Sequence, residues 1–194
     1  LDEENVLTQP PVTFYGTETT ISVEAISAAL ISAFESFAEE CSLSQFQITP
    51  EEFRPIFSEV LNTNPRYFYV HGGYDCYYST TTGYVTKIGI TYDYDQSTAE
   101  EMLEEYDKAL NEVTDEAVNT WSDMEKALYI NDYLTRNCGY DFTYSNYDAY
   151  DVLVSKTAVC QGYALAYVAL AQELGLECEV VTSQELDHAW NLVS

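Results

Sequence analysis

A cysteine and a histidine in the last quarter of the sequence are the residues best suited to carry chemistry. Cys160 stands where a loop meets the predicted start of an apolar helix, and His188 follows 28 residues later. The unpaired N–H groups and the positive end of the dipole at a helix N-terminus stabilise a thiolate. An imidazole beside such a thiol can take and return its proton, so the two residues could act as nucleophile and general base.

The segment around His188 indicates how the two residues would meet. Residues 177–182 alternate as a strand, and a second strand begins over 188–193. Strand alternation puts His188 and Trp190 on one face of this second strand. The pair with Cys160 then requires only that the helix start and this strand lie side by side.

The other four cysteines make a weaker case for chemistry. The total of five is odd, so at least one thiol stays outside any intramolecular disulfide set, and the pairing of Cys41, Cys76, Cys138 and Cys178 is left open. A small buried apolar residue is the better interpretation of Cys41 and Cys178. The sequence has no C-x-x-C pair and only two histidines, so we expect no metal site and no cofactor.

The elements that must position these residues are predicted from periodicity and helix-start motifs. We expect a helix over 22–40, a short strand over 45–48, a helix opened by a capping box at 49–52, a three-stranded meander over 67–94, and helices opened by capping boxes at 97–100 and 122–125 and by Cys160. This order indicates an α+β fold rather than a doubly wound sheet. We divide it into an N-terminal helix-and-meander region, 1–96, and a core, 97–194.

The helix predicted over 122–137 carries a polar residue on its apolar face. Met124, Leu128 and Leu134 form a stripe that we expect to be buried, and Asn131 lies on the same face. A polar side chain there needs a partner in the core or a place near a cleft.

The charge balance excludes several classes of function. Seven Lys and Arg against 33 Asp and Glu give a net charge of −26. Nucleic-acid binding needs clusters of basic residues, so we expect no nucleic-acid partner. No apolar run is long enough to cross a bilayer, so we expect no membrane insertion. The negative surface favours a cationic substrate segment.

Three stretches around the candidate pair resemble the core of the transglutaminase-like superfamily, a member of the papain-like fold group. They are KTAVCQGYA at 156–164, ELGLECEVV at 173–181 and DHAWNLV at 187–193. Upstream, EKAL at 125–128 and the Tyr140-Asp141 pair are similar to secreted bacterial members. The resemblance is firm over 126–193, and it implies a helix packed on antiparallel strands, preceded by the N-terminal region.

The resemblance assigns the nucleophile to Cys160 and the general base and acid to His188. The family's third catalytic residue, an Asp or Asn on the next strand, would lie beyond Ser194, so we expect the core to be truncated at its C-terminal end. Tyr140 is a candidate for the oxyanion hole, together with Gln161 and Trp190 as cleft residues. Asn131 occupies a place where relatives often carry His.

The resemblance implies a cysteine enzyme that transfers an acyl group from a peptide or protein amide through a thioester. Hydrolysis, as in a peptidase or amidase, is favoured. Protein cross-linking by a transglutaminase is an alternative, and a non-catalytic binding module that keeps the fold is an alternative of another class. The secreted bacterial relatives imply a location outside the cell or at its surface.

Overall fold

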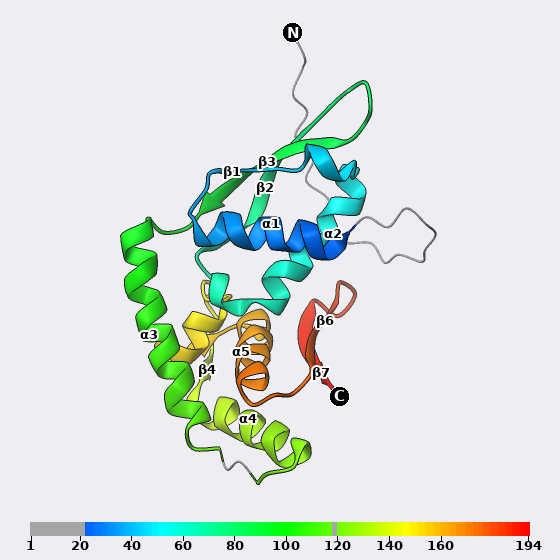
Figure 1. Cartoon of the computed structure of the whole chain (residues 1–194). Helices are drawn as coiled ribbons and strands as arrows, with labels where there is room; N and C mark the ends of the chain where they lie inside the picture. The colour runs from blue at the N-terminus through cyan, green and yellow to red at the C-terminus, as the bar shows by residue number, and fades with distance from the viewer. Residues whose placement is uncertain (1–21, 118–119) are drawn as a thin grey trace. The chain divides into compact units, whose positions relative to one another are not determined.

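The computed structural model describes residues 22–117 and 120–194. The chain separates into two compact units, whose elements are labelled in Figure 1. Of the described residues, the first unit takes in those up to Leu61 together with Tyr69–Asp93, and the second takes in Asn62–Phe68 and those from Tyr94 onward. Both units combine helices with strands, which confirms the expected α+β class.

The first unit contains a three-stranded antiparallel sheet with the strand order β1-β3-β2. The elements that begin in it are α1 (Val23–Glu35), β1 (Glu40–Ser42), the 3-10 turn η1 (Ser44–Phe46), α2 (Pro50–Thr63), β2 (Val70–Tyr78) and β3 (Val85–Tyr92). Its core is aromatic, because Phe34 meets Phe57 edge to face and Phe53 meets Tyr74 in the same way.

Two predictions for the first unit are corrected and one is confirmed. The capping box at the start of α2 is present, since Glu52 accepts a hydrogen bond from the Thr49 N–H at 2.9 Å. The strand expected over 45–48 is absent, because Gln47 adopts a left-handed conformation with φ of 50° directly after η1. The expected meander consists of two long strands, since β2 continues through Gly72 and Gly73 with a register shift.

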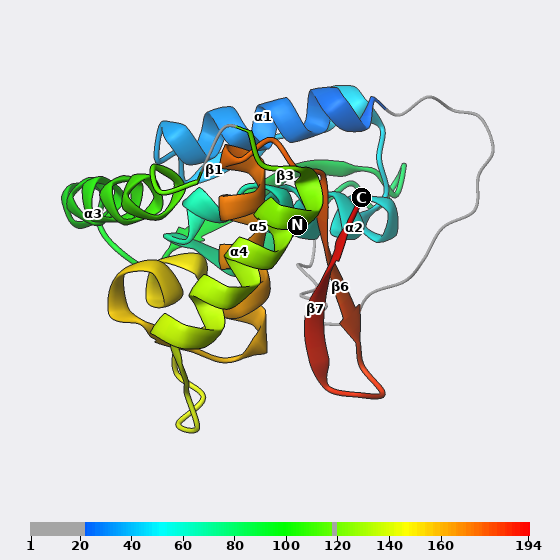
Figure 2. The same cartoon turned by 90° about the horizontal axis from the view of Figure 1, so that it is seen from below.

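The second unit is built around α5. Its elements are η2 (Pro65–Tyr67), α3 (Gln96–Thr114), α4 (Asp123–Asn137), β4 (Gly139–Tyr140), the π-helical turn η3 (Asp151–Ser155), β5 (Thr157–Ala158), α5 (Cys160–Glu173), β6 (Cys178–Ser183) and β7 (His188–Val193). β4 pairs with β5 in parallel, and β6 forms an antiparallel hairpin with β7. α5 packs against α3, α4 and both strands of the hairpin (Figure 2).

The composition of α5 explains its central place. A helix that is apolar all round is buried on most sides, and Ala164, Ala166, Val168 and Leu170 are all buried here. Gly162 lets the first turn approach its neighbours closely. A Cβ atom at this position would stand 2.6 Å from the Cβ of Ala158 and 2.9 Å from the carbonyl oxygen of Asp148.

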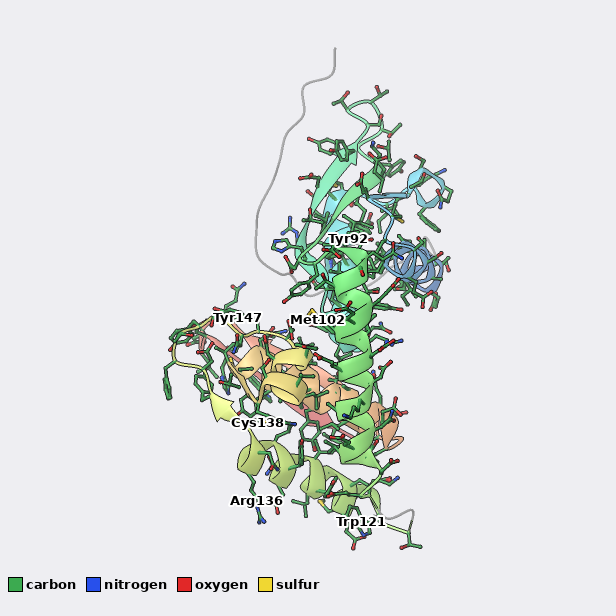
Figure 3. All side chains as sticks on the ribbon, turned by 90° about the vertical axis from the view of Figure 1, so that its left-hand side faces the viewer. Tyr92, Met102, Trp121, Arg136, Cys138 and Tyr147 are labelled. Carbon is green, nitrogen blue, oxygen red and sulfur yellow. The ribbon has the colours of Figure 1, made fainter. Side chains whose placement is uncertain are left out.

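The capping box predicted for α4 is present, whereas the one predicted for α3 is not. At α4 the predicted capping box is complete between Ser122 and Glu125. At α3 the cap is Asp95, whose carboxylate accepts from the Thr98 N–H at 2.9 Å, so the predicted box at Ser97 is wrong. Figure 3 shows α4 with Trp121 before its first turn and Arg136 in its last turn. None of the helices in the described ranges combines the length and apolar character that a bilayer crossing needs.

Candidate active site

Cys160 is the first residue of α5, where the chain passes from β5 into the helix. β4 and β5 lie side by side in parallel, with Tyr140 opposite Ala158. The N–H of Val159, the N-cap, donates to the carbonyl oxygen of Asn146 at 2.9 Å. The half-buried Cys160 is therefore held from two directions, by a strand pair and by the loop that follows β4.

The loop after β4 is organised by one buried carboxylate. Asp141 accepts hydrogen bonds from the N–H and hydroxyl of Thr143 at 2.8 and 2.6 Å. It also accepts from the N–H and hydroxyl of Ser145 at 2.8 and 3.1 Å, and from the N–H of Asn146 at 3.0 Å. These bonds, led by that from the Thr143 hydroxyl, hold the pKa of Asp141 far below its usual range.

The residues around Cys160 and His188 in the sequence do not by themselves indicate a role for Asp141. The spacing D-x-T-x-S-N over 141–146 is typical of side-chain turns in which Asp accepts from N–H groups two or more residues later, and it would have indicated this loop. Because Asn146 also holds Val159, the carboxylate acts on the position of Cys160 through the loop.

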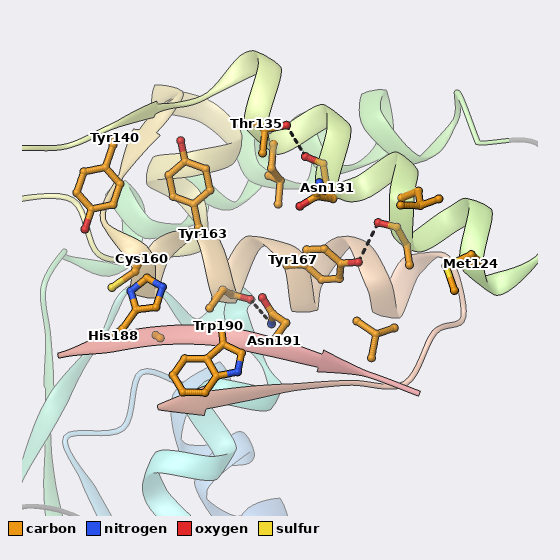
Figure 4. Close-up of a pocket in the computed structure, with 16 residues that line it drawn as sticks. Met124, Asn131, Thr135, Tyr140, Cys160, Tyr163, Tyr167, His188, Trp190 and Asn191 are labelled. Carbon is orange, nitrogen blue, oxygen red and sulfur yellow. Dashed lines mark hydrogen bonds between the residues drawn. The ribbon is translucent and has the colours of Figure 1, made fainter. Parts of the chain in front are cut away.

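His188 is the first residue of β7, which lies along α5. The side-chain amide of Asn191 donates to the carbonyl oxygen of Ala164 at 3.0 Å and ties the strand to the helix. The predicted alternation is present, since Ala189 is buried while His188 and Trp190 are exposed. Figure 4 shows the imidazole of His188 beside the thiol of Cys160.

Cys160 and His188 line one cavity of about 520 Å³ in the second unit, bordered by α4, β4, α5 and β7. Tyr140 and Trp190 line it as well, and the rings of His188 and Trp190 stack with their centroids 6.0 Å apart. Gln161, the remaining candidate, is half-buried on α5 and is not among the residues of the described chain that line this cavity.

Tyr140 lies at the same end of the cavity as Cys160 and directs its hydroxyl toward it (Figure 4). Desolvation and the neighbouring Cys160 thiol raise the pKa of the phenol, while a hydrogen bond from the Cys160 backbone N–H acts in the opposite direction. The net shift is upward, so the phenol keeps its proton at neutral pH. The Tyr140 oxygen therefore accepts from the Cys160 N–H, while the phenol retains a proton of its own that it can donate.

The wall that α4 contributes differs from the prediction. Met124 and Leu128 were expected to be buried, but they are 69% and 59% exposed and line the cavity. Leu134, the third member of the predicted stripe, is buried and lines the cavity as well, and Ile130 is the other buried position of α4. Asn131 lines the cavity too, which gives this polar residue its place in a cleft.

The other thiols have different surroundings. All five cysteines are free, and burial raises the pKa of Cys41, Cys76, Cys138 and Cys178. Lys156 donates to the Leu153 carbonyl at 2.6 Å and to the Tyr133 hydroxyl at 2.7 Å. Within the described ranges, no group of three or more His, Cys, Asp or Glu residues is arranged to hold a metal ion.

Comparison with known proteins gives one independent result. Residues 107–193 match the family model of the transglutaminase-like superfamily, and the matched segment includes α4, β4, α5 and the β6–β7 hairpin. No curated protein matches the chain.

Proposed function

We propose, from the match of residues 107–193 to the family model of the transglutaminase-like superfamily, that this protein cleaves amide bonds in peptides or proteins with Cys160 as the nucleophile. The superfamily includes cysteine-nucleophile enzymes. Hydrolysis is the favoured outcome, and transfer of the acyl group to an amine is the alternative that uses the same intermediate.

One observation carries the proposal: the thiol at the start of α5 and the imidazole at the start of β7 face each other in a single cavity. A helix N-terminus favours negative charge, and an adjacent imidazole can accept the thiol proton. The two residues come from segments 28 positions apart, and the Asn191–Ala164 hydrogen bond keeps their elements together.

The geometry supports a two-step acyl transfer. The Cys160 sulfur attacks the carbonyl carbon of the amide, and His188 receives the thiol proton. The negative oxygen that develops takes the place of the Tyr140 oxygen at the Cys160 N–H, and it accepts hydrogen bonds from this N–H and from the Tyr140 hydroxyl. His188 then gives the proton to the leaving amine as the C–N bond breaks, and a thioester remains on Cys160.

The second step returns the free enzyme. Water attacks the thioester carbonyl, His188 accepts its proton and returns it to the sulfur, and a carboxylic acid leaves. Tyr140 and Trp190 are 43% and 38% exposed, so water reaches this position freely. A primary amine in place of water would give a new amide by the same steps.

The proposal is tested with casein and a set of fluorogenic peptide amides. We expect turnover by the wild-type protein that Cys160→Ala abolishes and His188→Ala lowers by at least about 1000-fold. Cys138→Ala is the matched control, because it removes another half-buried thiol and should keep activity. Turnover that survives in Cys160→Ala would refute the assignment.

The two outcomes of the thioester are separated by adding a fluorescent primary amine. Hydrolysis predicts that most product is the free acid at millimolar amine. Predominant incorporation of the amine would show that the protein is a cross-linking enzyme instead.

A further inference from the structure

We infer, resting on the proposed function, that the substrate is an extended peptide segment with an apolar side chain next to the attacked amide. This side chain binds against an aromatic surface formed by Phe142 and Tyr140, which we call the aromatic shelf. The Phe142 ring is the specificity element of the shelf, since nothing in the two chemical steps requires it, whereas Tyr140 contributes its ring to the shelf and its hydroxyl to the chemistry.

The aromatic shelf begins at the nucleophile. Tyr140 points its hydroxyl at Cys160, and its ring contacts that of Phe142 with 5.3 Å between centroids. Phe142 is 80% exposed, the highest value for any large apolar residue among those described, and Tyr144 on the same loop is 61% exposed. Exposed aromatic rings beside a reactive group are typical of recognition surfaces.

The loop that carries the aromatic shelf is fixed by hydrogen bonds. Phe142 stands between Asp141 and Thr143, which are joined by two hydrogen bonds. Tyr144 has a φ of 56°, an unfavourable conformation for a bulky residue. The hydrogen bonds of the Asp141 carboxylate to Ser145 and Asn146 hold Tyr144 in this backbone conformation. The exposed position of the Phe142 ring is therefore built into the loop, so a ligand orders little chain when it binds.

The other side of the nucleophile offers a second apolar surface. His188 stacks with Trp190, and Leu186 at the tip of the β6–β7 hairpin is 69% exposed. Figure 2 shows the loop after β4 and this hairpin tip projecting to the same side of the second unit. A chain that places its amide at Cys160 thus passes between two apolar surfaces, which suits an extended peptide.

The charge of the protein favours a peptide, and not a second copy of the protein, as the ligand of the aromatic shelf. A net charge of −26 opposes self-association through this face. Glu185 and Asp187 flank Leu186 and are exposed, so basic residues further along a peptide would be attracted. The preferred substrate is therefore apolar beside the attacked amide and neutral or basic elsewhere.

The inference is tested by binding to the inactive Cys160→Ala protein. Fluorescent octapeptide amides of Ala, Gln and Lys carry Phe, Leu, Ser or Asp at each position in turn, and fluorescence anisotropy gives their affinities. We expect one position at which Phe and Leu bind about tenfold more tightly than Ser or Asp, the effect of burying one apolar side chain. Adding Phe142→Ser should remove this preference, while Phe142→Leu should keep most of it.

The outcomes separate the shelf from the proposed function. Equal affinities across the panel, or a preference that survives Phe142→Ser, would overturn the aromatic shelf. Apolar preference without turnover of the same peptides by the wild-type protein would support the shelf and overturn the proposed catalysis. Turnover without any apolar preference would support the proposed catalysis and overturn the aromatic shelf. Thermal unfolding checks that Phe142→Ser is folded, as expected for a residue that is 80% exposed.

Discussion

The five thiols of this chain differ in what surrounds them, and this difference determines which one can react. Burial raises the pKa of four of them, so at neutral pH they hold their protons more firmly than a free cysteine. Cys160 instead stands at a helix start beside an imidazole. Since the thiolate is the nucleophile, only this position combines access with a proton acceptor.

Alkylation is therefore expected to select Cys160. With limiting iodoacetamide at pH 7, peptide mapping of the native protein should find Cys160 labelled faster than any other cysteine, because the raised pKa of the other four thiols leaves less of each as thiolate. His188→Ala should slow its labelling. Faster labelling of Cys41 or Cys178 would contradict the prediction.

The role of Tyr140 can be tested apart from that of the thiol. Tyr140→Phe keeps the ring on the aromatic shelf and removes only the hydroxyl donor. We expect kcat to fall by about 100-fold with little change in KM, as for the loss of one oxyanion donor. Alkylation of Cys160 by iodoacetamide passes through no oxyanion, so its rate should stay the same. A parallel fall in alkylation would show that Tyr140 acts on the thiol instead.

At the scale of elements, the sequence predicts local features well and non-local ones poorly. The helix that opens with Cys160, the strand of His188 and the capping box at Ser122 all depend on residues close in sequence, and they are present. The β4–β5 pair joins residues 139–140 to 157–158, and two-residue strands carry no periodic pattern.

The apolar face of α4 shows a second limit of prediction from the sequence. Its period correctly indicates one apolar face, but periodicity does not say whether that face meets a core or a cavity. Met124, Leu128 and Leu134 all line the cavity, but Met124 and Leu128 are exposed whereas Leu134 is buried, as is Ile130. Only the packing of α5, which comes later in the chain, decides between these environments.

The first turn of α5 is sensitive to volume at Gly162. Gly162→Ala places a methyl group 2.6 Å from the Cβ of Ala158 and 2.9 Å from the Asp148 carbonyl oxygen, so these elements must shift. We expect a net loss of stability of about 1–3 kcal/mol, despite the better helix propensity of Ala, and slower labelling of Cys160. Gly72→Ala is the control, because a Cβ there meets no atom within 4 Å and should change stability by less than about 0.5 kcal/mol in urea unfolding.

The loop of Asp141 should give the protein a dependence on acid. The folded-state pKa of this carboxylate is depressed, so its contribution to stability is complete above the unfolded pKa of about 3.9 and is lost as the pH falls. Asp141→Asn is expected to lower the melting temperature at pH 7. The difference in melting temperature between wild type and variant should be smaller at pH 3 than at pH 7. A difference that stays constant would argue against a stabilising role of the ionised Asp141.

At the scale of the whole molecule, the few basic residues are mostly engaged with acidic partners. Arg66 pairs with Asp107, Lys87 with Glu40 and Arg136 with Asp132. The excess of 26 negative charges therefore creates a negative electrostatic field around the protein, which acts on approaching ligands. Such a field raises the local concentration of cationic ligands and speeds their association.

Salt should therefore act on cationic substrates and not on neutral ones. Two peptides with the same apolar residue beside the amide, one with flanking Lys and one with flanking Gln, are compared from about 20 to 200 mM NaCl, over which the Debye length shortens from about 20 to 7 Å. We expect kcat/KM of the Lys peptide to fall several-fold while that of the Gln peptide changes little, because screening weakens attraction to the negative surface. Glu185→Gln and Asp187→Asn together should reduce the salt effect, since both carboxylates are exposed on the hairpin next to His188. Equal responses of the two peptides would show that the net charge plays no part in substrate capture.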